Sequence, residues 1–337
     1  MTLLASGRVT MRDVAEAVGV SPMTVSRAFK DDRSVNKETR TRIQHAADRL
    51  GYVYDSTATA FRTQKSGFVA VTLPSINNAN FADTYRGLSL RIEGSGMQLL
   101  LGATNYRVEK EEELVRQLLT RNPEALVLTG GHHTQATRDL VSTKRLPVIE
   151  MWDLPEVPLG HAVGFSNAEA MALVVEHLAA TGRRKLAFLG ASAGADGRGA
   201  ERRAGAEAAA RRLGLSEMTF IDAGPAPVSM RHGAARTEAV KEGLHAFDAI
   251  VCVSDPVAFG ALSACRRIGL RVPDDIAITG FGQFEVARVS EPQITTVDVG
   301  AGRIGEAVAE LLDALFAGET APRRIEITPK LVRGETS

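Results

Sequence analysis

The 337-residue sequence contains only two cysteines and no hydrophobic run approaching the ~18 residues that a membrane-spanning helix needs. Cys252 and Cys265 match no metal or redox motif, so we expect both to be small core residues of a reduced protein. The N-terminus also lacks the apolar segment of a signal peptide. These absences argue against a secreted or membrane-bound protein and predict a cytoplasmic one, with no metal site and no membrane partner.

Signatures of catalysis are missing as well. The sequence holds no phosphate-binding GxxxxGK[ST] loop, no HExxH zinc motif and no GxSxG nucleophile elbow. The glycine-rich segment 190–197 lacks the GxGxxG spacing of dinucleotide sites, and no pair of carboxylates stands out for acid–base work. We therefore expect no enzyme, no catalytic residue and no cofactor.

The charge is unevenly distributed although the whole chain balances 40 basic against 40 acidic residues. Residues 1–65 contain eleven Lys and Arg against seven Asp and Glu, a net charge of +4, so the remainder carries −4. A basic head on a slightly acidic body is typical of a module that contacts phosphates, attached to a domain that does not.

The pattern inside this basic head predicts a helix-turn-helix. Thr10 can cap a first helix, Gly19 permits a sharp turn, and Ser21 can cap a second helix with Pro22 at its first position. Asn36 can cap a third helix over residues 37–50. The second helix of such a motif enters the major groove of DNA.

The exposed residues of the second helix suit contact with DNA. Arg27 can bind a guanine edge or a phosphate, and Met23 can touch a thymine methyl group. Short hydroxyl side chains near helix N-termini suit phosphates; they are Ser21, Thr24 and Ser26. An ordinary helical hairpin with a solvated polar face remains the alternative for this segment alone.

After residue 66, strands and helices alternate. The expected strands cover 68–73, 98–103, 125–128, 147–151, 185–189, 218–222, 249–253 and 275–279, with returning strands at 295–299 and 324–328. The expected helices cover 81–95, 110–121, 134–142, 168–181, 199–213, 231–243 and 258–268. Two successive βαβ series predict two lobes, each a parallel sheet flanked by helices, with a ligand cleft at the carboxyl ends of the strands.

Several segments resemble the lac repressor family of bacterial regulators. They are residues 10–15, 19–27, 50–52, 68–74, 126–129, 254–261, 269–281 and 291–296, in the order of the family. Residues 73–75, 80–82 and 162–167 are most similar to the gluconate-responsive repressors. The resemblance implies an α/β fold, with a helix-turn-helix headpiece and hinge helix before a two-lobed, periplasmic-binding-protein-like domain.

The same resemblance implies where the domains divide. We expect the DNA-binding domain at 1–55, a hinge helix at 56–66, lobe 1 at 67–166 plus 298–325, and lobe 2 at 167–297 plus 326–334. The hinge is too short to be stable alone, so it should order against a second hinge helix and the minor groove. Phe61 takes the place of the usual leucine wedge between base pairs, or else lies in the dimer interface.

Two sets of site residues follow. The expected DNA contacts are Thr10, Ser21, Pro22, Met23, Thr24, Ser26, Arg27, Asn36, Tyr52 and Phe61. The expected effector contacts are Asn80, Phe81, Arg198, Arg202, Ser254 and Gln283. Asp255, beside Ser254, can instead serve as a structural cap for the helix that follows.

One departure from the family concerns the charge of the effector. Relatives that bind neutral ligands carry an Asp after the segment matching Gly280-Phe281, whereas this chain has Gly282 and then Gln283. A cleft that lacks this carboxylate and retains arginines suits an anion, so we expect a sugar acid, with gluconate the leading candidate. A neutral sugar or a nucleoside remains the alternative. His132 and His133 can add switchable donors, although histidines in such a loop are commonly exposed.

These observations predict a regulator that binds operator DNA as a homodimer and responds to a small molecule. Two heads at a fixed spacing require a roughly palindromic operator. We expect the effector to release DNA, and the absence of a terminal heptad repeat predicts no tetramer. A sugar-binding protein without a DNA role would share the two lobes but would have no use for the basic head.

Overall fold

The computed structural model describes residues 9–30, 32–54, 66–192 and 197–337. The chain forms two compact units, residues 1–65 and 66–337, and each is described by itself. The expected hinge helix, with Phe61, falls on residues 55–65 and so lies outside the described part of the chain. None of the described helices is long and apolar enough to cross a membrane.

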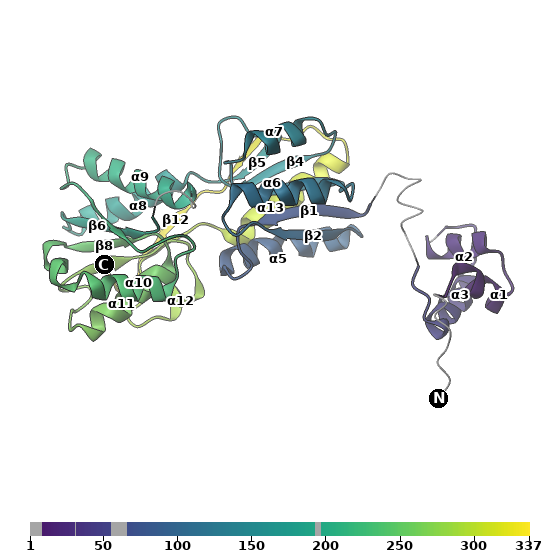
Figure 1. The fold of residues 1–337 in the computed structure, drawn as a ribbon, viewed down its shortest axis with the longest axis horizontal. Coiled ribbons are helices and arrows are strands. Elements are labelled where there is room, and N and C mark those ends of the chain that lie inside the picture. The colour runs from purple at the N-terminus through teal and green to yellow at the C-terminus, as the bar shows by residue number, and fades with distance from the viewer. Residues whose placement is uncertain (1–8, 31, 55–65, 193–196) are drawn as a thin grey trace. The chain divides into compact units, whose positions relative to one another are not determined.

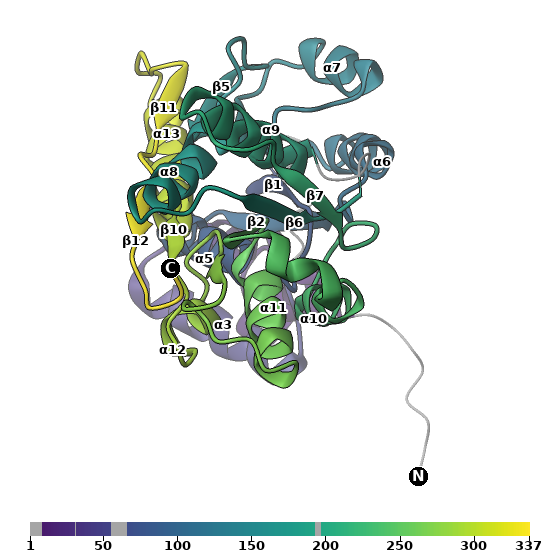
Figure 2. The ribbon, with the colours of Figure 1, turned by 90° about the vertical axis from the view of Figure 1, so that its left-hand side faces the viewer.

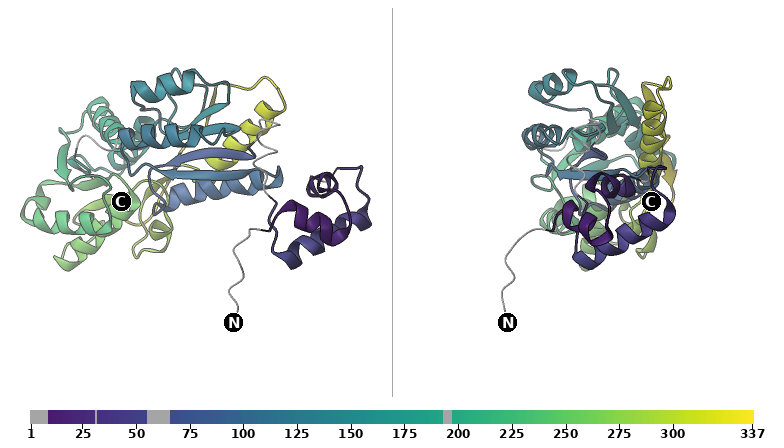
Figure 3. Two further views of the ribbon diagram at one scale, coloured as in Figure 1. Left: turned by 45° about the vertical axis from the view of Figure 1, so that its right-hand side comes forward. Right: turned by 90° about the vertical axis from the view of Figure 1, so that its right-hand side faces the viewer.

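The first unit contains the three predicted helices, α1 (Met11–Val18), α2 (Pro22–Phe29) and α3 (Lys37–Leu50), drawn in purple in Figure 3. Each begins at its predicted cap: Thr10 forms a capping box with Asp13, Ser21 Oγ accepts from the Thr24 amide at 3.1 Å, and Asn36 Oδ1 accepts from the Thr39 amide at 2.8 Å. The apolar faces meet in one small core, which consists of Val14, Ala15, Val18, Val25, Ala28, Val35, Ile43, Ala46 and Ala47.

The second unit begins with a six-stranded parallel sheet, which we call lobe 1 (Figure 1). Its strands, in spatial order, are β11 (Arg324–Glu326), β5 (His161–Gly164), β4 (Val148–Trp152), β3 (Ala125–Thr129), β1 (Phe68–Leu73) and β2 (Gln98–Ala103). Helices α5 (Ala79–Gly94) and α13 (Ala301–Phe316) share a core with Val69, Val71 and Leu73 of β1. Helices α6 (Val108–Leu119) and α7 (Gln135–Ser142) pack in a separate core with Ala70, on the opposite side of the same strand. Lobe 1 therefore has helices on both faces.

Lobe 2 is a four-stranded parallel sheet with the same layering. Its strands, in spatial order, are β7 (Thr219–Asp222), β6 (Leu186–Gly190), β8 (Ala249–Cys252) and β9 (Ala277–Thr279). Figures 1 and 2 show α8 (Asn167–Ala180) and α9 (Gly197–Arg212) on one face, and α10 (Met230–Ala239) and α11 (Asp255–Arg267) on the other. Cys252 and Cys265 are both fully buried, as expected, and burial raises the pKa of each thiol.

Three connections join the lobes. The first leads from β5 into α8, and the other two pass through β10 (Thr296–Asp298) and β12 (Lys330–Val332). These two strands pair antiparallel, with Val297 opposite Leu331, and lie side by side in Figure 2. The C-terminal end returns to lobe 2, where the Ile278 amide donates to the Thr336 carbonyl at 2.8 Å.

The observed elements correct the predicted pattern in several places. Strands β5 and β12, helix α13 and the short α12 (Glu285–Val289) were not predicted. Helix α5 begins two residues before its predicted start because the Asn78 side chain caps it at the Asn80 amide. The helix expected over 231–243 ends at Ala239 and is followed by a 3-10 helix, Lys241–Ala246.

The contact between α5 and α13 requires glycine at one point. A Cβ placed on Gly305 would overlap the Thr84 carbonyl oxygen and lie 2.8 Å from the Leu88 nitrogen, whereas a Cβ on Gly302 would meet nothing within 4 Å. We expect Gly305→Ala to lower the free energy of unfolding of lobe 1 by about 1–3 kcal/mol through overpacking. Gly302→Ala, in the same helix, is the matched control and should be neutral or stabilising by up to about 1 kcal/mol.

Urea unfolding followed through the fluorescence of Trp152, the single tryptophan of the chain, measures this difference directly in lobe 1. Equal stability of the two alanine variants would contradict the close helix contact.

Candidate effector site and DNA-binding surface

A pocket lies between the lobes, at the carboxyl ends of the lobe 1 strands, where ligands of such sheets bind. Its lining is Pro74, Thr104, Tyr106, Arg107, Val108, Glu111, Thr129, Gly130, His132, Asp153, Gly197 and Arg198. An outer cavity shares five of these residues and adds Glu109, Ala200, Glu201 and Ala204. Lobe 2 enters the pocket through the first turn of α9, where Gly197 and Arg198 lie.

Arg198 is the predicted effector residue that lines this pocket. The residue is only 9% exposed, and its guanidinium lies 5.4 Å from the ring centroid of Phe81. No hydrogen bond or ion pair joins Arg198 to any residue within the described ranges. Gly130 (φ +105°) leaves room for it, since a Cβ there would lie 3.2 Å from Arg198 Nη1. Arg198 is thus a buried cation available to a ligand.

Arg202 lies on the same helix but has a different environment. Its Nε donates to Asn167 Oδ1 at 2.9 Å, its Nη1 donates to the Val253 carbonyl at 3.0 Å, and its guanidinium stacks 4.2 Å from the ring centroid of Phe281. Asn167 in turn donates to Asp153 Oδ1 at 3.1 Å. Arg202 is therefore held within a network that joins α9, α8 and lobe 1, and it does not line the pocket described above.

Asn80 and Phe81 lie at the contact between the lobes. Asn80 Nδ2 donates to the Gly282 carbonyl at 2.8 Å, so a lobe 1 side chain holds a lobe 2 loop. Gly282 has φ +113°, and a Cβ there would lie 2.6 Å from Asn80 Nδ2. Space and backbone conformation both favour glycine at this position.

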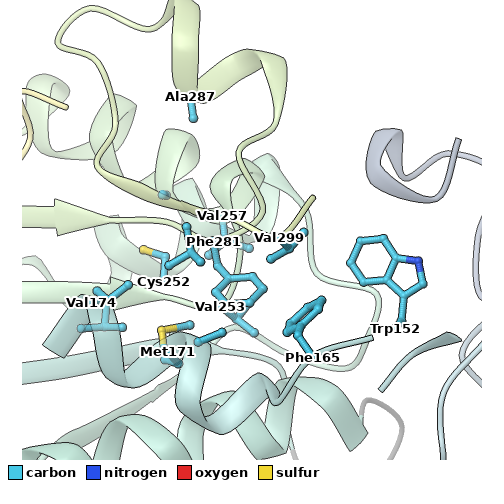
Figure 4. Close-up of a cluster of buried hydrophobic side chains, with 14 of the residues drawn as sticks. Trp152, Phe165, Met171, Val174, Cys252, Val253, Val257, Phe281, Ala287 and Val299 are labelled. Carbon is cyan, nitrogen blue, oxygen red and sulfur yellow. The ribbon is translucent and has the colours of Figure 1, made fainter. Parts of the chain in front are cut away.

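Aromatic side chains fill the space beside this contact. Phe81 packs edge-on against Trp152 with ring centroids 5.0 Å apart, Trp152 lies 5.9 Å from Phe165, and Phe165 lies 6.2 Å from Phe281. Figure 4 shows Trp152, Phe165 and Phe281 in a row that crosses from lobe 1 into lobe 2. This row of buried rings forms an apolar contact between the lobes.

Ser254 and Gln283 do not line the pocket. Ser254 occupies the N-cap position of α11 without a side-chain hydrogen bond. Gln283 has a left-handed backbone (φ +50°), and its Oε1 accepts from Arg288 of α12 at 3.0 Å. Ser254 and Gln283 stay predicted contacts, for an effector that extends beyond this pocket.

Asp255 has a structural role, but it is not the cap that the sequence suggested. It is the first residue of α11, and its carboxylate accepts from Thr296 Oγ1 at 2.5 Å and from the Phe284 amide at 2.7 Å. Burial raises the pKa of this carboxyl group to about 7, against the opposing effect of these hydrogen bonds. Asp255 thus ties α11 to β10 and to the loop that contains Gly282.

The two adjacent histidines differ completely. His132 is exposed, and its Nε2 lies 2.9 Å from Glu201 Oε1 of α9, which makes a bridge between the lobes. His133 is no exposed loop residue: its side chain is fully buried, with Nδ1 2.5 Å from Glu111 and Nε2 3.2 Å from Glu150. Desolvation opposes protonation of His133, but the two glutamates outweigh it and raise its pKa to about 9.

The predicted DNA contacts lie on one small domain, with several already engaged in helix caps. Met23 is 62% exposed, Pro22 and Arg27 are exposed, and Thr24 and Ser26 are half-buried. The Ser21 and Thr24 hydroxyls bond each other at 2.9 Å, and Tyr52 packs against Phe29 with ring centroids 6.0 Å apart. The exposed face of α2, with Arg27 as its cation, remains the predicted DNA-contacting surface.

Sequence reasoning missed much of the pocket, above all Tyr106, Arg107 and Asp153. Arg107 directly precedes α6 only because the helix begins at Val108, two residues before its predicted start, so its unusual cap position was not visible in the sequence. Asp153 was not visible either, because its two contacts come from Gly131 and Asn167, which only the folded chain brings together.

Comparison with known proteins agrees with this architecture. Residues 10–55 match the family described as "Bacterial regulatory proteins, lacI family", and residues 175–337 match a periplasmic binding protein-like domain. The HTH-type transcriptional regulator GntR of Escherichia coli (strain K12) is 32% identical over 96% of this chain and 95% of its own. The chain belongs to the lacI family.

Solved structures of lacI family members confirm the fold. A transcriptional regulator from Silicibacter pomeroyi superposes with a TM-score of 0.90 at 29% identity, covering 97% of this chain and 99% of its own. The lac repressor dimer bound to operator and the anti-inducer ONPF superposes with a TM-score of 0.83 at 24% identity, covering 98% and 99%. This lacI family member is a DNA-binding transcriptional regulator and not an enzyme. Repressors of the family bind operator DNA and small-molecule effectors.

The buried His133 predicts how the free energy of unfolding depends on pH. A pKa raised from 6.5 to about 9 means that the stabilisation from charged His133 is complete below pH 6.5 and is lost as the pH rises through 9. We expect the free energy of unfolding of lobe 1 to fall by roughly 1–3 kcal/mol over this range, and His133→Gln to remove most of that fall.

Urea unfolding monitored by Trp152 fluorescence at pH 6.5 and pH 9 measures the effect, with the exposed His245→Gln as control. The same pH dependence in His133→Gln as in the parent protein would show that another group is responsible.

Proposed function

We propose that this protein represses sugar-acid catabolic genes in the cytoplasm and that gluconate, or a related sugar acid, releases it from its operator by binding between the lobes. The observation that carries the proposal is Arg198, a cation that is 9% exposed, lines the pocket and lacks a partner among the described residues. Burying such a charge is unfavourable unless an anion compensates it. The similarity to GntR regulators over almost the whole chain supports the same class of effector.

The polar groups around Arg198 suit the remainder of a sugar acid. Carboxylate and amide oxygens and hydroxyl groups bind sugar hydroxyls well, and Thr104, Thr129 and Asp153 supply such groups in the pocket. Asn80, Phe81, Arg202, Ser254 and Gln283 complete the proposed set, and they would act when the lobes close differently around the ligand.

Release of DNA would follow from a shift between two lobe arrangements. The contacts that join the lobes, Asn80 to Gly282 and His132 to Glu201, lie beside the pocket, so a bound ligand can favour one arrangement over the other. In this proposal lobe 1 comprises 67–166 with 298–325 and lobe 2 comprises 167–297 with 326–334. The hinge at 56–66 then transmits the change to the DNA-binding domain at 1–55.

We also propose that the protein acts as a homodimer on a roughly palindromic operator. Two DNA-binding domains then read two half-sites, with the α2 residues and Arg27 in successive major grooves. Phe61, with Thr10, Asn36 and Tyr52, completes the proposed DNA-contacting set.

Fluorescence anisotropy on the DNA upstream of the protein's own gene tests the effector. At fixed salt, we expect millimolar gluconate to weaken DNA binding, related aldonic acids to act in part, and neutral hexoses to have no effect. Release by neutral hexoses or nucleosides, without any response to sugar acids, would contradict the proposal and favour the neutral-ligand alternative.

Substitution of Arg27 tests the DNA-binding surface. We expect Arg27→Ala to weaken operator binding by about 1–3 kcal/mol because it removes either a base contact or a phosphate contact. Loss of discrimination between operator and altered operator would identify a base contact, and a shallower salt dependence would identify a phosphate contact. Arg49→Ala, an exposed arginine of α3, is the control. No change on Arg27→Ala would rule out Arg27 as a DNA contact.

A further inference from the structure

The N-terminus of α6 opens onto the same pocket and has an unusual residue at its cap position. N-cap positions favour Ser, Thr, Asp and Asn, whose side chains accept hydrogen bonds from the first amides of the helix. Here the N-cap is Arg107, which makes no side-chain cap. Arg107 and Val108, the first residue of α6, line both the pocket and its outer cavity. An arginine at this position places positive charge beside the positive end of the helix dipole, and the two together can attract an anion. The first turn of α6 also carries Glu109 and Glu111.

The turn before α6 is itself strained. Asn105 and Tyr106 both have left-handed backbones, with φ +53° and +62°, although neither is glycine. Such conformations cost free energy and persist where the surrounding structure holds them, often at ligand sites. Tyr106 packs against the core of lobe 1 and also lines the pocket. This turn directs the chain so that Arg107 follows at the pocket edge.

The carboxylates around the pocket are already engaged, whereas the arginines retain donors. Glu111 pairs with His133, and Asp153 accepts from the Gly131 amide at 2.9 Å and from Asn167. Glu201 bonds His132, and Glu109 lies 3.9 Å from Arg107 in an exposed, weak ion pair. Neither Glu111 nor Asp153 forms an ion pair with Arg198, which reaches the pocket from lobe 2 with no partner in the described chain.

The geometry points to an anion subsite in which Arg198 of lobe 2 and Arg107 of lobe 1 bind the acidic group of the effector over the N-terminus of α6. This assignment rests on the proposed function, and it adds where the charged end of the ligand lies and which residue of lobe 1 selects it. Because the two arginines come from different lobes, the anion itself would draw the lobes together. The effector would then favour the closed arrangement through its charge, and its hydroxyl groups would add to affinity.

Three substitutions on α6 test the subsite by calorimetric titration of the full-length protein. We expect Arg107→Gln to weaken gluconate binding about tenfold or more, the range of a charge-assisted hydrogen bond, and Arg107→Lys to recover part of it. Arg116→Gln, which removes an exposed arginine on the last turn of α6, should leave binding unchanged. Arg198→Gln should also weaken binding, and its urea unfolding curve checks that the variant is folded.

The ligands distinguish the sources of the charge. Gluconamide keeps the hydroxyl groups but lacks the carboxylate. It should therefore bind the parent protein more weakly than gluconate does, and its affinity should be the same for the parent protein and for Arg107→Gln. Glucose 6-phosphate carries its anion at the other end of the sugar, and tighter binding of this compound than of gluconate would assign the subsite to a phosphate. Gluconate binding that Arg107→Gln leaves unchanged would overturn the subsite alone. Failure of the parent protein to bind any anionic sugar would overturn both the subsite and the proposed effector.

Discussion

A guanidinium withdrawn from water is stabilised by a counter-charge, and Arg198 forms no ion pair or hydrogen bond with any described residue, although Asp153 lines the same pocket. The surrounding structure holds it in place all the same. Gly130 leaves the space, the Phe81 ring supplies a weak cation–π contact, and the first turn of α9 carries the side chain to the pocket. A cation kept in this way stores unfavourable free energy that an anionic ligand can release. The proposed selectivity for sugar acids depends on this buried positive charge.

The position of Arg198 on α9 also links the proposed ligand to the arrangement of the lobes. Arg202 on the same helix donates hydrogen bonds to Asn167 and Val253, so a shift of α9 would disturb α8 and the residue that follows β8. Asn80 of lobe 1 donates a hydrogen bond to the Gly282 carbonyl. Asp255 accepts hydrogen bonds from the same loop, at the Phe284 amide, and from Thr296 of β10. A ligand that neutralises Arg198 would therefore act beside the contacts that join the lobes, and this is the basis of the two-state response that we propose.

The starts of the three helices in the DNA-binding domain could be predicted from the sequence because their signals are local. Thr10, Ser21 and Asn36 each bond an amide within their own helix, and Gly51 ends α3 with a left-handed backbone. Long-range features were harder. Strand β5 has only four residues and is defined by its pairing with β4 and β11. Gln283, with φ +50° and its side chain bonded to Arg288, is not among the residues that line the pocket and stays a predicted effector contact. Arg107, which does line the pocket, follows two residues with left-handed backbones. Local chemistry predicted most of the helices and strands, although it missed β5, β12, α12 and α13, whereas the composition of the site depends on contacts between distant segments.

Thermodynamic linkage gives the most direct test of the account, because coupling between two binding sites must be reciprocal. We would measure the affinity of the protein for gluconate twice, free in solution and saturated with operator DNA. We expect weaker gluconate binding on the operator, by the same factor by which gluconate weakens operator binding. Equal affinities in the two states would show that a sugar acid in the interlobe pocket does not control DNA binding, and would contradict the central claim.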